Sequence, residues 1–425
     1  MNNLNPMNNQ PSHKCNFCHS PLHHLVTDLG VQPLCEDKIR VEDLTKMEPH
    51  FPLQVYVCKK CFLVQTPAVV SPEIIYRDYA YYSSYSDTWV QHAKQYVDYV
   101  SERFAITPKH LVAEIASNDG YLLQFFKQKG VPVLGIDPST EIAQYAEREK
   151  GIKTEVKFFG YETAKYLVET YGKANLIIGN NVLAHVPDIN DFLKGMKYFL
   201  AEGGLITMEF PHLERLIEEN QFDTIYHEHF SYFSFTTVKE IFKSYGLCLF
   251  DVQQLKTHGG SIRIHACHQG DTSKPISQAV HDLLKHEHEL GMDTLAYYDH
   301  FNNKVKETKR KILEFLIKAK RENKQVVGYG APGKGNTLLN YCGVRTDFLD
   351  YTVDINPHKQ GNFLPGTHIP IHHPDKIKET KPDYVFILPW NLKDEIINYN
   401  KYIYEWGGKF VVPIPELMIL NNHQE

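Results

Sequence analysis

The sequence lacks the long apolar run that a membrane-spanning helix requires. None of its apolar stretches approaches about 20 residues, the length needed to cross a bilayer as a helix. The polar start, MNNLNPMNNQ, also lacks the apolar core of a secretory signal. With 425 residues, 42% of them hydrophobic, the chain suits a globular protein of two or three domains. We therefore expect a cytoplasmic protein with no membrane partner.

An excess of basic charge is absent as well. The formal net charge is -6, which argues against a broad electrostatic surface for nucleic acid. We expect no nucleic-acid partner, although an RNA-modifying protein stays an alternative. The sequence leaves the oligomeric state open, and a monomer is one of the options.

Cysteines are few, and half of the eight fall into two CxxC pairs. Two thiolates separated by two residues can reach one ion together, and a second pair completes a closed tetrahedral site. The alternative is a pair of redox motifs. We predict a structural Zn²⁺ held by Cys15, Cys18, Cys58 and Cys61. The other thiols, at Cys35, Cys248, Cys267 and Cys342, are expected to be buried or free in a reducing cell.

A GxGxxG dinucleotide motif is missing from the place where it would be expected. Residues 111–137 predict a strand, a small polar turn, a helix and a second strand, which together make a βαβ unit. The turn, ASNDG, lies among acidic residues that suit the ammonium and sulfonium of S-adenosylmethionine better than a pyrophosphate. The alternative is a doubly wound domain without a cofactor. The predicted cofactor-binding residues are Glu114, Ser117, Asn118, Asp119, Gly120, Asp137 and Asn180.

The ends of the predicted strands mark the rest of this cleft. Asp137 ends the second strand, where a carboxylate can accept hydrogen bonds from ribose hydroxyls. A later strand ends at Asn180 and Asn181, at the edge where open α/β sheets bind ligands, and His185 follows in the same loop. The strand GGLITMEF leads into IYHEHFSYFS, residues 225–234, which we expect over the cleft. LCLFDVQQL and GGSIRIHACH predict an antiparallel hairpin that closes the sheet.

A second α/β unit follows a helical stretch over residues 280–320. The segment QVVGYGAPGKGNTLLNYCG predicts a strand, a glycine-rich loop and a helix whose N-terminus favours an anion. It is not a Walker A loop, because glycine and asparagine follow Lys334 where serine or threonine would be needed. We predict a phosphate cradle, with a tight structural turn as the alternative. The predicted substrate contacts are Asn181, Gly330, Lys334, Asn336 and Thr337.

The order of these motifs resembles a known family, the S-adenosylmethionine-dependent sugar C-methyltransferases of deoxysugar biosynthesis. The likeness covers nearly the whole chain and rests on CNFC, CKKC, YYSSYSDTW, EIASNDGYLL, NNVLAHVPD, YHEHFSYFS, GGSIRI, GYGAPGKGNTLLN and FLPGTHIPI. It implies an α/β protein with a small N-terminal zinc-binding domain (1–70) and a Rossmann-like class I methyltransferase domain (71–275). A C-terminal Rossmann-like α/β domain (276–425) would help to hold a nucleotide-linked sugar.

The resemblance also implies roles for the residues of IYHEHFSYFS. His229 would be the catalytic base, with Tyr226 and Glu228 nearby, while Asn181 and His185 would line the sugar site. The substrate would be a nucleotide-linked keto-deoxysugar of the 4-keto-6-deoxyhexose type, and an enolate would attack the cofactor's methyl group.

Carbon methylation needs these residue types, because a C–H bond becomes acidic only beside a ketone. A histidine that titrates near neutral pH can take the proton. Tyr226 or His185 could donate a hydrogen bond to the oxyanion, and Glu228 could orient a histidine. The alternatives are a structural polar role for each residue, above all for His227, or another methyl acceptor such as RNA or a small metabolite.

Overall fold

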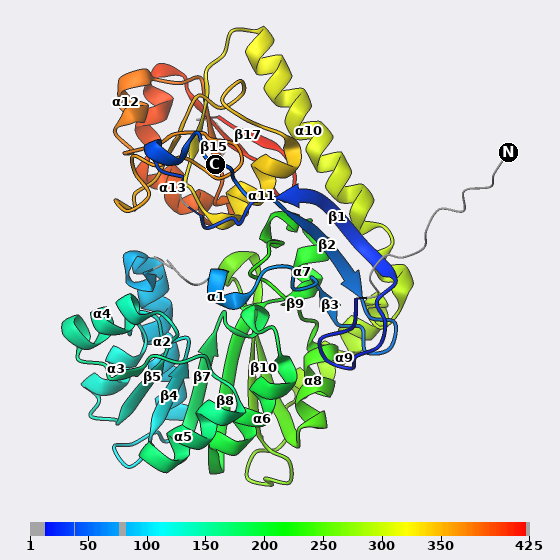
Figure 1. Cartoon of the computed structure of the whole chain (residues 1–425), viewed down its shortest axis with the longest axis vertical. Helices are drawn as coiled ribbons and strands as arrows, with labels where there is room; N and C mark the ends of the chain where they lie inside the picture. The colour runs from blue at the N-terminus through cyan, green and yellow to red at the C-terminus, as the bar shows by residue number, and fades with distance from the viewer. Residues whose placement is uncertain (1–12, 38, 76–81, 422–425) are drawn as a thin grey trace, which may run out of the picture.

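Three β-sheets organise the part of the chain that the structure describes (Figure 1). The computed structural model describes residues 13–37, 39–75 and 82–421. In Figure 1 the central α/β domain lies below the C-terminal α/β domain, and the long helix α10 (Phe301–Arg321) runs along one side of the latter. Within the described residues, no helix is both long enough and apolar enough to span a membrane.

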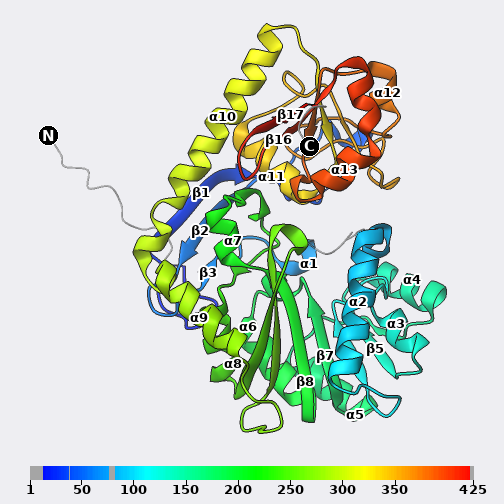
Figure 2. The same ribbon diagram turned by 180° about the vertical axis from the view of Figure 1, so that it is seen from behind.

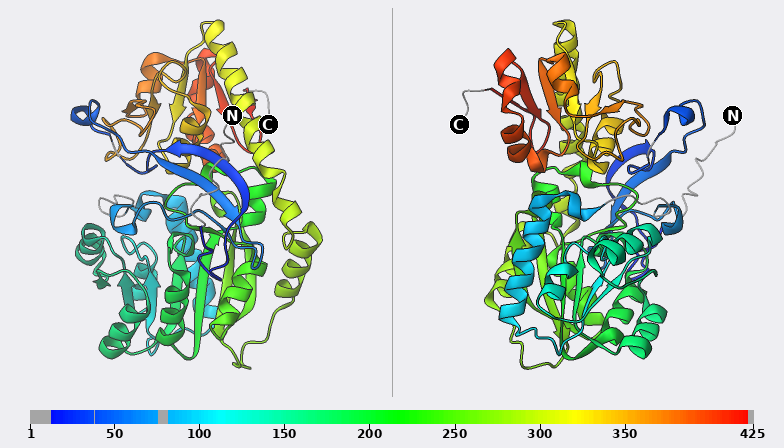
Figure 3. Two further views of the ribbon diagram at one scale, coloured as in Figure 1. Left: turned by 45° about the vertical axis from the view of Figure 1, so that its right-hand side comes forward. Right: turned by 90° about the vertical axis from the view of Figure 1, so that its left-hand side faces the viewer.

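A small antiparallel sheet builds the N-terminal unit. Its order is β1-β2-β3-β9, made of β1 (His24–Gln32), β2 (Phe51–Val57), β3 (Val64–Gln65) and β9 (Ser231–Tyr232). Figure 3 shows the β1–β2 hairpin curving between the two α/β domains. The fourth strand belongs to the distant motif IYHEHFSYFS, so this motif is part of the N-terminal sheet as well as of the central domain.

The central sheet has seven strands in the order β10-β11-β8-β7-β4-β5-β6. All neighbours are parallel except β11, which runs antiparallel to β8 and β10. The predicted βαβ unit and the closing hairpin are therefore both confirmed. The strands are β4 (Val112–Ile115), β5 (Val133–Ile136), β6 (Thr154–Glu155), β7 (Ala174–Asn180), β8 (Leu200–Pro211), β10 (Leu247–Leu255) and β11 (Ser261–His268).

Helices cover both faces of the central sheet, as Figure 2 shows from behind. Successive residues of a strand point to opposite faces, so Val112 packs into one core while Ala113 and Ile115 pack into the other. The first core includes α2 (Asp87–Arg103), α3 (Leu123–Gln128) and α4 (Thr140–Lys150). The second includes α5 (Tyr161–Tyr171), α6 (Ile189–Phe199), α8 (Phe235–Ser244) and α9 (Gln278–Leu290). Two short helices, α1 (Pro72–Ile75) and α7 (Leu213–Glu218), lie outside these layers.

The C-terminal sheet has the order β14-β13-β12-β15-β16-β17, parallel except for β17. This arrangement confirms the predicted Rossmann-like unit and, with the other sheets, the predicted α/β fold class. The strands are β12 (Val326–Tyr329), β13 (Thr352–Val353), β14 (Ile371–His372), β15 (Tyr384–Ile387), β16 (Lys409–Val412) and β17 (Met418–Leu420). The helices are α11 (Gly333–Cys342), α12 (Lys376–Thr380) and α13 (Lys393–Tyr399).

The hydrophobic core crosses between these units. One cluster joins Leu53 of the N-terminal hairpin to Phe222 beside the motif and to Leu338 of α11. Another joins Cys58 and Leu63 of the cysteine-rich end to the central sheet. Burial of apolar surface thus holds the N-terminal unit against both α/β domains.

Candidate active site

Contacts with backbone carbonyls hold His229 and the residue after it beside the loop that follows β7. His229 Nδ1 lies 2.8 Å from the carbonyl oxygen of Thr224, which can only accept, so Nδ1 carries the proton and Nε2 carries the lone pair. The amide of the next residue, Phe230, donates to the carbonyl of Ala184 at 2.8 Å, which ties the motif to the loop after β7. This tautomer presents an imidazole nitrogen that can accept a proton.

Two other predicted residues surround the His229 ring. The Tyr226 ring centroid lies 4.0 Å away and that of His185 lies 4.6 Å away. Burial, and then the neighbouring His185, lowers the pKa of His229 well below its usual value, and burial lowers the pKa of His185 to about 4. Both imidazoles are therefore neutral at physiological pH, and the structure brings the three predicted residues together.

Glu228 and His227 face the N-terminal unit instead. The Cys35 thiol donates to Oε1 of Glu228 at 3.6 Å, and burial together with the charge of Glu36 raises the pKa of Glu228 to about 8. His227 Nε2 lies 3.2 Å from the carbonyl oxygen of Pro52 on β2. The group that orients His229 is thus the Thr224 carbonyl and not Glu228, contrary to the role expected from the sequence.

The glycine-rich turn before α11, residues 330–333, is the C-terminal turn. Two of its amides are already bonded to carboxylates: Ala331 donates to Asp354 at 2.7 Å, and Gly333 donates to Glu36 of the N-terminal unit at 3.0 Å. Gly330 has a φ of 89°, and a Cβ there would lie 2.5 Å from Cδ of Pro389. This arrangement favours the tight structural turn over the phosphate cradle, because protein carboxylates take the place of an anion.

The first turn of α11 connects the same units. Asn336 Nδ2 donates to the carbonyl of Cys35 at 2.5 Å, and Thr337 Oγ1 donates to the carbonyl of Ile225 at 3.1 Å. Both residues are buried, and only Asn336 Oδ1 keeps a buried acceptor with no partner among the described residues. The contacts favour a structural role for Thr337 and leave one atom of Asn336 for a ligand.

Lys334 turns towards the central domain. Its Nζ donates to Asn391 at 2.8 Å and lies 4.7 Å from the ring centroid of Trp390, whose indole donates to Asp223 at 2.7 Å. Burial lowers the pKa of Lys334, and its charge contributes to the low pKa of His229. Lys334 therefore brings a cation from the C-terminal domain to the neighbourhood of the predicted base.

The turn between β4 and α3, residues 116–120, is the cofactor turn. Both carboxylate oxygens of the neighbouring Glu114 are buried and have no hydrogen-bond partner among the described residues, and the same holds for Ser117 Oγ and Asn180 Oδ1. Burial, and then the charges of Asp119 and Asp137, raises the pKa of Glu114 well above its usual value. Unpaired buried acceptors are costly, so these atoms fit a ligand that brings donors and positive charge.

Asp137 and the segment before α2 fasten this turn. The Asp137 carboxylate accepts from the amides of Asn118 at 3.0 Å and Ser139 at 2.9 Å, and burial raises its pKa to about 6. The amide of Ser83 donates to Asn118 Oδ1 at 2.9 Å, and that of Ser84 donates to Asp119 at 3.1 Å. Gly120, with a φ of 75°, completes the turn with the left-handed conformation that glycine adopts most easily.

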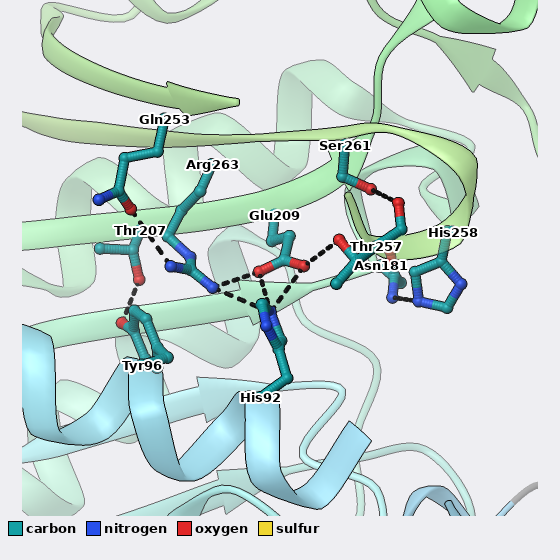
Figure 4. Close-up of polar contacts among 10 residues, drawn as sticks. All are labelled: His92, Tyr96, Asn181, Thr207, Glu209, Gln253, Thr257, His258, Ser261 and Arg263. Carbon is teal, nitrogen blue, oxygen red and sulfur yellow. Dashed lines mark hydrogen bonds and ion pairs between the residues drawn. The ribbon is translucent and has the colours of Figure 1, made fainter. Parts of the chain in front are cut away.

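A buried polar network lies beside Asn181 (Figure 4). The backbone N–H of Asn181 donates to the backbone carbonyl of Glu209 at 2.7 Å. The Glu209 carboxylate bonds to His92 of α2, to Arg263 of β11 and to Thr257. Burial alone would raise the pKa of Glu209, but the His92 bond and the Arg263 charge lower it to about 2. The network is therefore ionised and ties the end of β8 to α2, to β11 and to the turn before β11.

The four paired cysteines form a closed cluster. The Sγ atoms of Cys15 and Cys61 lie 3.5 Å apart, as do those of Cys18 and Cys58, and all four lie within 4.8 Å of one another. Tetrahedral zinc with Zn–S bonds of about 2.3 Å needs sulfur separations of roughly 3.8 Å, so the cluster fits the ion. Four thiolates fill its coordination sphere, which makes the site structural.

The match to known proteins extends over nearly the whole chain. Family models match as a zinc binding domain over residues 15–76, a methyltransferase domain over 89–251 and a C-methyltransferase C-terminal domain over 256–415. The C-methyltransferase NovU of Streptomyces niveus is 36% identical over 412 residues, which are 97% of this chain and 98% of that protein. The chain belongs to this C-methyltransferase family. The resemblance found in the sequence is thereby confirmed.

Solved methyltransferases are similar to part of this C-methyltransferase. A SAM-dependent methyltransferase from Anabaena variabilis is 15% identical with a TM-score of 0.35, over 41% of this chain and 84% of that one. The magnesium protoporphyrin IX methyltransferase of Synechocystis, solved with bound SAH, is 14% identical with a TM-score of 0.34, over 46% of this chain and 92% of that one.

This C-methyltransferase uses S-adenosylmethionine and contains zinc, as its family domains and its cysteine cluster indicate. The unpaired oxygens of Glu114 and Ser117 fit the cofactor's ammonium and hydroxyl donors. Two residues near the site escaped sequence analysis: Thr224, which acts through a backbone carbonyl, and His258, which follows a strand without a recognisable motif. Neither kind of contact has a local sequence signal.

Proposed function

We propose that this C-methyltransferase methylates the carbon beside the ketone of a nucleotide-linked keto-deoxysugar, of the 4-keto-6-deoxyhexose type. The observation that carries the proposal is the tautomer of His229. Its Nδ1 is engaged by the Thr224 carbonyl 2.8 Å away, so Nε2 is the nitrogen that accepts a proton. A neutral imidazole near the mouth of the sheet suits removal of a proton from a carbon acidified by a ketone.

The neighbours of His229 supply the donor that an enolate needs. The Tyr226 hydroxyl and an imidazole N–H of His185 are both groups that donate hydrogen bonds, and both rings lie against the His229 ring. A donor aimed at the ketone oxygen stabilises the oxyanion that forms when the proton leaves. In our proposal the proton passes to Nε2 of His229 while Tyr226 or His185 holds the oxygen.

The arrangement of the two α/β domains suits a ligand with two chemically different parts. Ligands of such sheets bind beyond the carboxyl ends of the strands, and Lys334 from the C-terminal domain lies close enough to influence His229 of the central domain. A substrate with a reactive sugar and an anionic diphosphate would need both the base and the cation. We assign Lys334 to the diphosphate or the adjoining sugar, and the open Oδ1 of Asn336 to the same substrate.

The cofactor would bind at the other side of the base. Glu114, Ser117 and Asn180 would face it with their unpaired oxygens, and Asp137 would exchange its hydrogen bonds for ribose hydroxyls. S-adenosylmethionine supplies the electrophilic methyl group when bound. We also propose a cytoplasmic location, which the eight cysteines favour because none of them forms a disulfide and thiols stay reduced there.

The decisive experiment is a substrate panel. The enzyme is incubated with labelled cofactor and with dTDP- and GDP-linked 4-keto-6-deoxysugars, and the products are followed by mass spectrometry and NMR. We expect one new methyl group on a carbon next to the ketone. Methylation of oxygen, or of RNA in a parallel incubation but no sugar, would contradict the proposal.

Replacing His229 tests the base. His229→Ala should bind cofactor and sugar normally but lose about 10²–10⁴-fold in turnover, because a positioned base contributes this much. It should also lose exchange of the sugar's α-hydrogen with deuterated water, if the wild type catalyses that exchange. The matched control is His227→Ala, since that side chain faces β2. Wild-type turnover in His229→Ala would move the role to His185 or Tyr226.

A further inference from the structure

The turn that joins β10 to β11 holds an unusual backbone conformation. His258 has φ 53° and ψ 24°, in the left-handed region that few side chains other than glycine, asparagine and aspartate adopt readily. Gly259 and Gly260, with φ of 88° and 117°, continue the turn. A conformation of this kind persists only where the surroundings hold it, and such places cluster at functional sites.

Several contacts hold this turn in place. Thr257 Oγ1 donates to the buried Glu209 carboxylate at 2.8 Å, and Gln221 Nε2 donates to the carbonyl of Gly259 at 2.7 Å. A Cβ on Gly259 would lie 2.6 Å from the Trp390 ring, so the C-terminal domain also presses against the turn. The backbone on both sides of His258 is therefore held by three separate parts of the chain.

The imidazole of His258 meets the amide of Asn181. Nε2 of His258 lies 3.0 Å from Nδ2 of Asn181, as Figure 4 shows. An amide NH₂ only donates, so this Nε2 must be the acceptor. Burial, and then the charge of Lys334, lowers the pKa of His258 to about 4, which keeps the ring neutral and able to accept.

This bond decides which end of the Asn181 amide is left over. With one N–H of Nδ2 donated to His258, Oδ1 is the amide atom that is buried and has no partner among the described residues. Oδ1 can only accept, and an unpaired buried acceptor is costly. The Asn181 backbone also has a left-handed φ of 53°, so the main chain and the side chain are both constrained.

We propose that His258 is a positioning residue that sets the orientation of the Asn181 amide, so that the substrate group facing Asn181 is a hydrogen-bond donor, a sugar hydroxyl. The inference rests on the proposed function, because it assigns the donor to the acceptor sugar. Oδ1 of Asn181 cannot hold the ketone oxygen, since a carbonyl offers no proton. The ketone would instead face the donors of Tyr226 or His185.

Three variants of His258 test the inference. His258→Phe keeps a ring next to Trp89, whose centroid lies 5.0 Å from that of His258, but offers no acceptor. His258→Gly also removes the acceptor and adopts the left-handed backbone without strain, which protects the test if the phenylalanine variant does not fold. His258→Asn is the conservative control, because asparagine tolerates this conformation and can accept.

The probes are a nucleotide-linked 4-keto-6-deoxyhexose and its 2-deoxy and 3-deoxy counterparts. The wild type should prefer the full sugar over one counterpart by about tenfold in kcat/KM, the value of one hydrogen bond. In His258→Phe and His258→Gly this preference should vanish, through a rise of about tenfold in KM for the full sugar. His258→Asn should restore part of it, and cofactor affinity measured by calorimetry should not change.

The outcomes separate the inference from the proposed function. An equal loss on all three sugars, or a loss of cofactor affinity with the sugar preference intact, would overturn the role of His258 while methylation of the sugars upheld the proposed function. No wild-type turnover on any sugar would overturn the proposed function and this inference with it.

Discussion

The cofactor turn (116–120) and the C-terminal turn (330–333) occupy equivalent places in two Rossmann-like units, each after the first strand of a parallel sheet. At the cofactor turn the Glu114 carboxylate is buried with no partner among the described residues. At the C-terminal turn Glu36 and Asp354 bring carboxylates to the backbone amides. The cofactor turn thus lies beside buried acceptors that have no donor among the described residues. The backbone donors of the C-terminal turn are already bonded to carboxylates of the protein.

The difference shows that a glycine-rich turn is not by itself a ligand site. What matters is whether other parts of the chain have used its polar groups. The C-terminal turn and the first turn of α11 contact the N-terminal unit and the motif, and Lys334, directly after the turn, lies close enough to influence His229 of the central domain. The cofactor turn keeps its unpaired oxygens at a cost in stability, as functional sites commonly do.

The largest expected effect comes from removing the zinc that supports β3, the strand paired with the motif. The zinc cluster lies directly before β3, whose Gln65 contacts Cys15 Sγ and whose backbone pairs with Ser231 of the motif. Cys58→Ser should lose zinc, lower the free energy of unfolding by several kcal/mol and reduce turnover at least a hundredfold, because the strand that holds the motif loses its anchor. Metal content, melting and turnover are measured together.

The same variant sharpens the comparison. Cofactor affinity by calorimetry should change only a few-fold, since the cofactor turn lies in the central domain away from the cysteines. Cys248→Ser, at a thiol outside the cluster, is the matched control and should keep its zinc. Full activity of a zinc-free Cys58→Ser enzyme would contradict the structural role of the zinc.

The next effect compares one substitution in the two turns. Glu114→Gln should weaken cofactor binding by about ten- to a hundredfold, because a charged hydrogen bond contributes about 1.5–3 kcal/mol. Without cofactor the variant should melt no lower than the wild type, since the Glu114 carboxylate has no hydrogen bond to lose within the described chain.

Glu36→Gln should do the opposite. It removes a charge from the N-terminus of α11 and weakens the bond to the Gly333 amide, so stability should fall by about 1 kcal/mol while cofactor affinity stays the same. Melting curves measure the stability of both variants, and calorimetry measures their affinity for the cofactor. Equal effects of the two substitutions on cofactor affinity would remove the distinction between the turns.

The smallest expected effect is a pH dependence of stability that comes from Glu228. The pKa of Glu228, about 8, lies above the value of about 4.3 for an unfolded glutamate, so the unfolded chain ionises first as the pH rises. The contribution of Glu228 to stability is therefore lost progressively between about pH 4.3 and 8, and is constant outside this window. Glu228→Gln should flatten the curve, with a gain over the wild type that grows through the window to about 1–3 kcal/mol above pH 8. Melting at pH 5 and pH 8.5 measures it, with the exposed Glu314→Gln as control.

Much of the fold was predictable because its signals are local. Two CxxC pairs predict four ligands, and the apolar periodicity around ASNDG predicts β4, α3 and β5. The hairpin of β10 and β11 follows from two adjacent alternating segments. The grouping of His229, Tyr226 and His185 was expected from the family resemblance, and the structure brings their rings together.

The sequence alone determined the zinc ligands, the two Rossmann-like units and the place of the motif IYHEHFSYFS after β8, since each signal, such as one CxxC pair, comes from residues close together in the chain. Only the tertiary structure decided that the motif adds a strand to the N-terminal sheet, that Thr224 orients His229 and that Glu36 fills the C-terminal turn. These contacts join segments far apart in the chain, and several use backbone groups that every residue possesses. Side-chain identity cannot predict them, because packing selects the partner.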